Sequence, residues 1–347
     1  MGNRKNIGAD GVSRIREQRK QAPSVSALTT GILRGDTTAL ARGLTLVESH
    51  KKEDRKKANI LLEKCLAQKS DSIRIGITGV PGVGKSTFIE VFGALIANMG
   101  KKVAVLAIDP TSTVSKGSIL GDKTRMQLLV KNTNAFIRPS PSGDSLGGVA
   151  RSTREGIILC EAAGYQVILI ETVGVGQNEM AVHSMVDFFL LLKLAGAGDE
   201  LQGIKRGIVE MADAIVVNKA DGANVKQAEH ARSEFERALH LYPPKVNGWQ
   251  PKTLVCSSLQ NEGISEIWEM IDDYIVNNKK SGHLQSKRRS QNKKWFLQTV
   301  EEQLNARFYE SPVIKEKLKT LLELVEDHRI SPFRAAEELF GFYKLMP

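Results

Sequence analysis

Cysteine is scarce in this chain of 347 residues: there are three, Cys65, Cys160 and Cys256, widely spaced and each in an apolar setting. They form no C-x-x-C pair, and the six histidines show no metal-ligand spacing. Because disulfide-stapled folds and zinc sites both need such groupings, neither is expected. The fold must therefore depend on an ordinary hydrophobic core, which 41% hydrophobic and 25% charged residues can supply.

Long apolar runs are also missing. The run Phe188–Leu192 has five residues, far short of the roughly 18 that suggest a membrane span, and it predicts a buried strand. The N-terminal stretch contains Asp10 and Glu17 and has no apolar centre, which argues against a secretory signal. We therefore expect a cytoplasmic protein. The mitochondrial matrix remains an alternative, because the N-terminal arginines would suit a short targeting segment.

Acidic residues are outnumbered, which leaves a net charge of +10. Residues 279–294 contain seven Lys or Arg and no Asp or Glu. Such a run can bind nucleic acid, a membrane surface or an acidic partner. No aromatic side chains interleave it, as stacking on single strands would require. We favour a solvated linker between a domain and a tail, and expect neither nucleic acid nor a membrane as partner.

Strand-like and helix-like patterns alternate through the middle of the chain. Helices are expected over residues 86–99 and 146–163, and strands near 73–78, 103–108, 135–138, 167–171, 187–192, 213–218 and 253–256. This alternation requires a mainly parallel sheet with helices on both faces. The predicted fold class is α/β, of the P-loop NTPase type. We expect an N-terminal helical segment (1–70), a P-loop domain (71–280) and a C-terminal helical arm (281–347).

One motif predicts nucleotide binding. Residues 79–87 read Gly-Val-Pro-Gly-Val-Gly-Lys-Ser-Thr and follow the apolar run Ile73–Ile77; a strand, a glycine loop, Lys-Ser and a helix is the order that a P-loop requires. Lys85 is expected to bind the β- and γ-phosphates, and the Ser86 hydroxyl to ligate Mg²⁺. The residues expected to contact the nucleotide here are Gly79, Val80, Pro81, Gly82, Val83, Gly84, Lys85, Ser86 and Thr87.

A second motif, Asn218-Lys219-Ala220-Asp221, follows the apolar strand Ala214–Val217 and predicts the base. The Asp221 carboxylate can accept paired hydrogen bonds from guanine, whereas adenine would leave it without donors. Asn218 could bond the other side of the base or a neighbouring loop, and the Lys219 stem could cover the ring. The guanine oxygen is expected to lie near the loop Ser257, Ser258 and Leu259, after the next strand.

Three acids and a glycine are expected to complete the site. Asp109 and Glu171 each end an apolar strand pattern, and Asp122 lies between them in the chain. They could gather around a Mg²⁺ held by Ser86 and the phosphates, although Asp109 and Asp122 could also be ordinary loop acids. Gly174 would let a backbone N–H approach the γ-phosphate and withdraw again.

These motifs, with three further stretches, resemble those of the MeaB/ArgK GTPases, which in animals include the methylmalonic aciduria type A protein. The stretches are Gly117–Met126 (Gly-Ser-Ile-Leu-Gly-Asp-Lys-Thr-Arg-Met), Glu171–Gln177 (Glu-Thr-Val-Gly-Val-Gly-Gln) and Gly198–Gly207 (Gly-Asp-Glu-Leu-Gln-Gly-Ile-Lys-Arg-Gly). The resemblance implies a Mg²⁺-dependent GTPase that converts GTP to GDP and acts as a chaperone of an adenosylcobalamin-dependent acyl-CoA mutase. Methylmalonyl-CoA mutase is the first candidate partner. The chaperone would gate cofactor loading and protect or reactivate the mutase.

The resemblance also implies roles for particular residues. Lys85, Glu171 and Lys205 would be catalytic, and Ser86, Asp109, Asp122 and Glu171 would surround the metal. Lys205 would swing toward the phosphates when the partner binds; a solvated lysine is the alternative, since Arg206 could serve equally. No Asp-x-His-x-x-Gly motif occurs, so the chain is not expected to hold cobalamin itself.

The C-terminal residues show helical periodicity. Trp295, Leu297, Val300, Leu304 and Phe308 recur mostly at three- and four-residue steps, and a second such pattern begins at Pro312. In the family this region resembles an arm that pairs subunits, which implies a homodimer; packing against its own domain is the alternative.

Two other functions agree less well with the motifs. A kinase or transport-driving ATPase conflicts with Asp221, which ATP would leave without a partner. A metal-delivery GTPase would need the cysteine-rich motif that this chain lacks.

Overall fold

The computed structural model describes residues 23–68, 70–109, 126–141, 146–172, 178–196 and 206–344. The chain divides into two compact units, one ending at Leu284 and the other beginning at Gln285. In the part of the chain that is described, no helix is long and apolar enough to cross a membrane.

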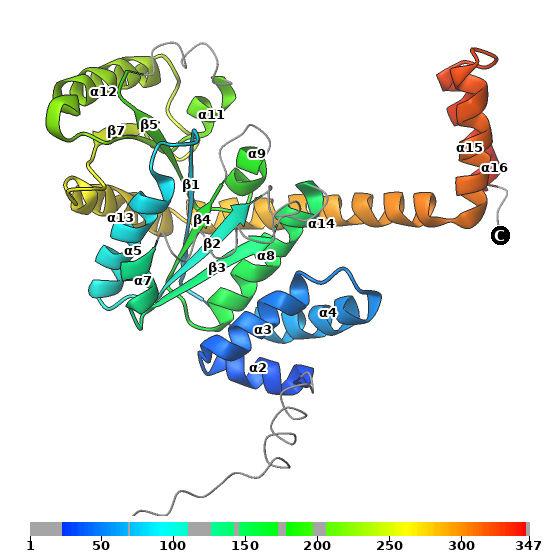
Figure 1. Cartoon of the computed structure of the whole chain (residues 1–347), viewed down its shortest axis with the longest axis horizontal. Coiled ribbons are helices and arrows are strands. Elements are labelled where there is room, and N and C mark those ends of the chain that lie inside the picture. The colour runs from blue at the N-terminus through cyan, green and yellow to red at the C-terminus, as the bar shows by residue number, and fades with distance from the viewer. Residues whose placement is uncertain are drawn as a thin grey trace, which may run out of the picture. The chain divides into compact units, whose positions relative to one another are not determined.

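A seven-stranded sheet forms the centre of the first unit, with strand order β3-β2-β4-β1-β5-β6-β7 (Figure 1). Every neighbouring pair is parallel. The strands are β1 (Ile73–Gly79), β2 (Val103–Asp109), β3 (Ala135–Pro141), β4 (Val167–Glu171), β5 (Phe188–Leu194), β6 (Ala214–Asn218) and β7 (Lys252–Val255). β4 and β6 are buried at every residue, as strands covered on both faces should be. The strands predicted from the sequence and the α/β fold class are confirmed.

Helices cover both faces of this sheet. α5 (Lys85–Asn98), α7 (Gln127–Lys131) and α13 (Ile264–Lys280) share one apolar cluster with the central strands, in which Phe88 and Phe92 of α5 stack. α12 (Val225–His240) packs on β5 and β6 in a separate cluster. Shorter elements lie between the strands: α9 (Asn178–His183), α11 (Arg206–Met211) and the 3₁₀ turn η1 (Gly222–Asn224). Burial of these apolar faces is the main force that holds the helices on the sheet.

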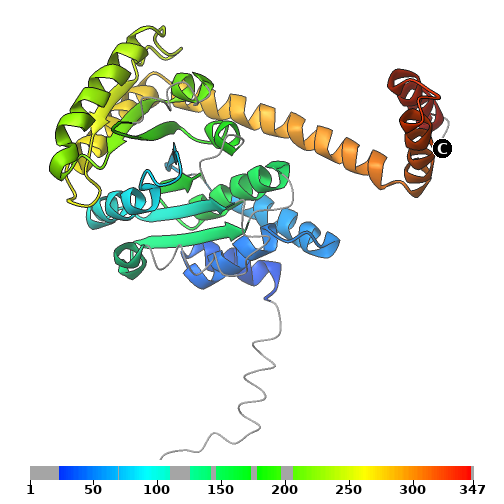
Figure 2. The same cartoon turned by 45° about the horizontal axis from the view of Figure 1, so that its top comes forward.

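The N-terminal helical pattern corresponds to three helices, α2 (Val25–Leu33), α3 (Thr37–Val47) and α4 (Lys52–Leu66). The Asp36 side chain caps α3 by accepting hydrogen bonds from the N–H groups of Thr38 and Ala39. α3 and α4 pack against α8 (Leu146–Ala162), as Figure 2 shows. A Cβ on Gly156 of α8 would lie 3.1 Å from Leu44, so α3 and α8 approach closely. The N-terminal helices thus belong to the same compact unit as the sheet.

The described part of the second unit contains three helices, α14 (His283–Glu310), α15 (Pro312–Glu326) and α16 (Pro332–Lys344). The first two residues of α14 belong to the first unit. A small cluster of Phe308, Ile314, Leu321, Ala335 and Leu339 joins them. Helices are present at both places where the sequence predicted them, α14 and α15, whereas the sequence pattern did not predict α16.

The basic run 279–294, expected to be a solvated linker between a domain and a tail, spans the boundary between the two units and is largely helical. Residues up to Lys280 end α13, and those from His283 onward form the first turns of α14. Lys and Arg are good helix formers, and the helical run is interrupted only at Ser281 and Gly282, where Gly282 has a φ of 73°.

Candidate nucleotide-binding site

The P-loop lysine is held within its own loop. Lys85 is 9% exposed, and its Nζ donates hydrogen bonds to the carbonyl oxygens of Gly79 (2.7 Å) and Val80 (3.2 Å). Burial lowers the pKa of Lys85, and the negative charges of Glu171 and Glu179 oppose that shift. The ammonium therefore lies inside the loop, surrounded by carbonyls and acids, at the place where the sequence predicts phosphate binding.

Gly84, between the loop and α5, can only be glycine. Its φ of 92° is in the left-handed region, and a Cβ there would lie 2.8 Å from Nδ2 of Asn218. The same Nδ2 donates a hydrogen bond of 2.9 Å to the Val83 carbonyl. The absence of a side chain at Gly84 thus allows the predicted base-recognition motif to reach the P-loop.

Asn218 connects the P-loop to the loop after β7. Besides its bond to Val83, its Oδ1 accepts hydrogen bonds from the Ser258 backbone N–H (3.2 Å) and hydroxyl (2.8 Å), and from the Cys256 thiol (3.4 Å). Of the two roles expected for Asn218, the structure shows the bond to a neighbouring loop. The side chain is 1% exposed, so its polar atoms depend on these partners.

Asp221 lies beside the loop that follows β7. Its Oδ2 accepts a hydrogen bond of 2.7 Å from the Ser257 hydroxyl, and the backbone N–H of Ala220 donates to the Cys256 carbonyl. The structure thus brings together the two segments that the sequence assigns to the guanine base. Leu259, at the end of the second segment, is exposed.

The predicted metal residues are partly described. Ser86 Oγ donates a hydrogen bond of 3.1 Å to Glu171 Oε1, because β4 pairs with β1 so that Glu171 lies opposite Ile77. Two hard oxygen donors at this distance fit Mg²⁺, which prefers such ligands. The Asp109 backbone ends β2, the strand next to β4. Within the described residues no cluster of three or more His, Cys, Asp or Glu suited to a metal occurs.

Three predicted site residues, Asp122, Gly174 and Lys205, lie outside the described residues, as does the Asp109 side chain. Their roles therefore remain predictions.

The sequence analysis missed Glu179. This residue is 4% exposed, lies in the first turn of α9 and interacts electrostatically with Lys85. A signal was present, namely an acid shortly after the glycine-containing stretch that follows Glu171, but its burial depends on how α9 packs.

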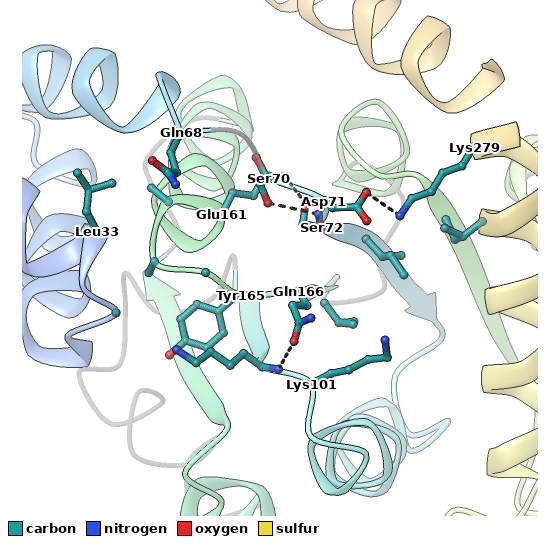
Figure 3. A pocket seen from close by; sticks show the side chains of 18 of the residues that line it. Leu33, Gln68, Ser70, Asp71, Ser72, Lys101, Glu161, Tyr165, Gln166 and Lys279 are labelled. Atoms are coloured by element: carbon teal, nitrogen blue, oxygen red, sulfur yellow. Dashed lines mark hydrogen bonds and ion pairs between the residues drawn. The ribbon is translucent and has the colours of Figure 1, made fainter.

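A hollow of the described chain lies at the opposite edge of the sheet (Figure 3). It has a volume of about 470 Å³ and is lined by segments that precede β1, β2 and β4. Two of its acids already have cationic partners, since Lys279 pairs with Asp71 at 2.7 Å and Arg74 with Glu161 at 2.8 Å. In parallel α/β sheets ligands bind beyond the carboxyl ends of the strands. We therefore assign the nucleotide site to the P-loop edge and not to this hollow.

A P-loop at the end of the central strand, followed by its helix in a parallel seven-stranded sheet, defines a P-loop nucleoside triphosphatase. A family model described as "Methylmalonyl Co-A mutase-associated GTPase MeaB" matches residues 40–313. The chain belongs to this family of GTPases, as the sequence motifs indicated, and GTP hydrolysis is its activity.

Individual relatives agree with this assignment. "GTPase ArgK" of Escherichia coli is 46% identical over 309 residues, covering 89% of this chain and 93% of that protein. "Methylmalonic aciduria type A homolog, mitochondrial" of Mus musculus is 43% identical over 335 residues, covering 94% of this chain and 81% of that protein. A solved structure described as "Crystal structure of LAO/AO transport system kinase" is similar with a TM-score of 0.74 and 37% identity, covering 92% of this chain and 98% of that one.

Proposed function

We propose that this GTPase is a chaperone of an adenosylcobalamin-dependent acyl-CoA mutase, with methylmalonyl-CoA mutase as the first candidate. The observation that carries the proposal is the match of residues 40–313 to a family described as mutase-associated. The chaperone would use its GTPase cycle to gate cofactor loading and to protect or reactivate the mutase. We further propose a cytoplasmic location, with the mitochondrial matrix as the alternative.

The nucleotide would bind at the carboxyl edge of the sheet. Lys85 would leave the carbonyls of Gly79 and Val80 and donate to the β- and γ-phosphates. The Asp221 carboxylate would accept hydrogen bonds from guanine while the Ser257 hydroxyl keeps it oriented. Asn218, fully used by protein partners, would hold the base loop against the P-loop rather than contact the base.

Ser86 and Glu171 would hold Mg²⁺, with Asp109 and Asp122 as further acids around it. When bound, the metal would supply positive charge to the phosphate oxygens. Ser86 and Glu171 already lie within hydrogen-bonding distance, so little rearrangement of the two side chains is needed. Gly174 and Lys205 would act at the γ-phosphate, Lys205 only after the partner has bound.

We also propose a homodimer formed through the C-terminal arm. Several large apolar side chains of α14 are exposed in the single chain, namely Phe296, Leu297, Val300 and Leu304. They lie on the helix whose sequence pattern predicted an apolar face. Contiguous apolar side chains of this size usually mark a protein interface.

The test is to measure GTP and ATP hydrolysis by the purified protein, each with and without methylmalonyl-CoA mutase. We expect turnover selective for GTP that rises when the mutase is added, and Lys85→Ala should abolish it. Lys57→Ala, at an exposed position of α4, is the matched control and should leave GTP turnover unchanged.

The possible outcomes separate the functions. GTP turnover that is indifferent to this mutase would retain the GTPase and remove the partner. Preference for ATP would contradict base recognition by Asp221 and favour the kinase or ATPase alternative; the similar solved structure is described as a transport system kinase.

A further inference from the structure

Two threonine hydroxyls meet in the interior, next to the P-loop. Thr172, which follows the last residue of β4, donates a hydrogen bond of 2.8 Å from its Oγ1 to Oγ1 of Thr78 in β1. Thr172 is 0% exposed and Thr78 is 1% exposed. A buried hydroxyl that loses its partner is costly, because no water can replace the lost bond. Each hydroxyl therefore depends on the other, and neither residue is among those predicted to bind the nucleotide or the metal.

Strand pairing explains why the two threonines meet. β1 and β4 are parallel neighbours whose last register pair is Ile77 with Glu171, and the backbone N–H of Thr172 donates to the Ile77 carbonyl oxygen at 3.0 Å. Side chains alternate in step along paired strands, so the next residue of each strand projects to the same face. Thr78 and Thr172 thus lie side by side, one residue beyond that register pair and immediately before the P-loop.

Each threonine is also the chain neighbour of a predicted site residue. The first precedes Gly79, whose carbonyl oxygen accepts a hydrogen bond of 2.7 Å from Lys85. The second follows Glu171, whose carboxylate accepts a hydrogen bond of 3.1 Å from Ser86. Because Lys85 and Ser86 are consecutive, these two bonds, the threonine bond and the chain itself close a ring. The ring joins the end of β1, the end of β4 and the start of α5.

Two of the three hydrogen bonds in this ring would change when the nucleotide and the metal bind as proposed above. Lys85 would turn from the Gly79 carbonyl to the phosphates, and the Ser86 hydroxyl would turn from Glu171 to the metal. The two threonine hydroxyls are enclosed by protein and belong to neither set of ligands. Of the three bonds, theirs is the one that would still join β4 to β1, one residue from the Glu171 carboxylate.

We propose that Thr78 and Thr172 are a pair of positioning residues that hold Glu171 in place for the metal, and thereby set how tightly Mg²⁺ binds together with the nucleotide. Side chains that orient a metal ligand tune the affinity of the site without touching the metal. Mg²⁺ demands near-ideal octahedral geometry, so a carboxylate that is less firmly placed would bind it less well. The inference rests on the nucleotide and metal site proposed above.

The test is the affinity of the full-length protein for a fluorescent GDP analogue, measured in EDTA and at increasing Mg²⁺ concentrations. Thr172→Val removes the hydroxyl and keeps a side chain of similar shape. We expect the affinity in EDTA to stay within about twofold of the wild type, while the Mg²⁺ concentration for half-maximal tightening rises about fivefold, the effect of one neutral hydrogen bond. A purely structural role would instead weaken binding equally in both conditions.

Further variants test the pair rather than either residue alone. Thr172→Ser keeps the hydroxyl and should restore the wild-type Mg²⁺ requirement. Thr78→Val removes the other partner and should raise the requirement to the same extent. Combining it with Thr172→Val should add little, because both changes break the same bond.

Thr253→Val is the matched control, the same change at a buried position of β7. The Thr253 hydroxyl has no hydrogen-bond partner among the described residues, so this variant should leave the Mg²⁺ requirement unchanged.

An unchanged Mg²⁺ requirement in both single valine variants would overturn the inference, as would equal weakening in EDTA and in Mg²⁺. Additive effects in the double variant would also overturn it, since the two residues would then act independently. If the wild-type protein bound GDP without responding to Mg²⁺, the proposed metal site itself would fail, and with no GDP binding at all the proposed nucleotide site would fail.

Discussion

Single residues at the nucleotide site are selected by their neighbours as well as by the ligand. Gly84 is required by backbone conformation and by the nearby Asn218 amide, whereas Gly82 in the same loop has a similar φ of 81° but no atom within 4 Å of where a Cβ would lie. A substitution at Gly82 would therefore test backbone strain alone, whereas one at Gly84 would add a steric clash.

Gly84→Ala should abolish measurable GTP binding, because the added methyl group would displace Asn218 from Val83 and open the contact between the P-loop and the base loop. We expect a loss of about 2–3 kcal/mol in the free energy of unfolding, from strain plus the lost hydrogen bond. Gly82→Ala should cost about 1 kcal/mol from strain alone. Equilibrium denaturation and titration with GTP would test both; equal effects of the two variants would contradict the steric argument.

At the scale of elements, one buried acid of α8 links it to the N-terminal helix α4. Glu155 of α8 receives hydrogen bonds from Arg55 of α4, at 2.9 and 3.2 Å, and from Arg151, at 2.9 Å. Burial raises the pKa of Glu155, and the hydrogen bond and charge of Arg151 oppose this. The ion pairs thus offset part of the cost of burying this carboxylate between two helices.

Glu155→Gln should lower the free energy of unfolding by about 2 kcal/mol, because it leaves Arg55 and Arg151 without their charge partner in a partly buried position. Glu229→Gln is the matched control. It removes the acid of an exposed pair with Arg232 and should cost less than about 0.5 kcal/mol. Urea denaturation followed by circular dichroism would measure the difference, and similar midpoints for the two variants would show that the buried pair does not hold α4.

For the whole molecule, the proposed homodimer depends on the exposed apolar side chains of α14. Leu304 is 61% exposed in the single chain. Leu304→Asp should convert the dimer to a monomer, since a charge at an apolar interface is desolvated without a partner. Light scattering coupled to gel filtration would measure the mass, and GTP turnover measured without mutase should be retained.

Leu241→Asp is the control for that experiment, because Leu241 is 86% exposed and belongs to the first unit rather than to the arm. A monomeric wild type, or a dimer that survives Leu304→Asp, would contradict the proposed interface.

The strands, the P-loop and the GTPase family could all be predicted from the sequence, because each depends on residues that are close together in the chain. The run Val103–Ile108 has the pattern of a strand buried on both faces whatever its exact neighbours, and residues 79–87 form a phosphate loop wherever a strand precedes them and a helix follows. Local periodicity likewise predicted α15, but it did not show that α16 follows, or that the basic run is helical.

Contacts between distant residues were decided by the tertiary structure alone. The sequence does not identify Val83 as the partner of Asn218, and it does not indicate that Arg55 meets Glu155. These contacts follow from strand order and helix packing, which bring together segments far apart in the chain. The sequence therefore determined which chemistry this protein carries, and the packing of α8 and α9 on the sheet determined which charges surround it.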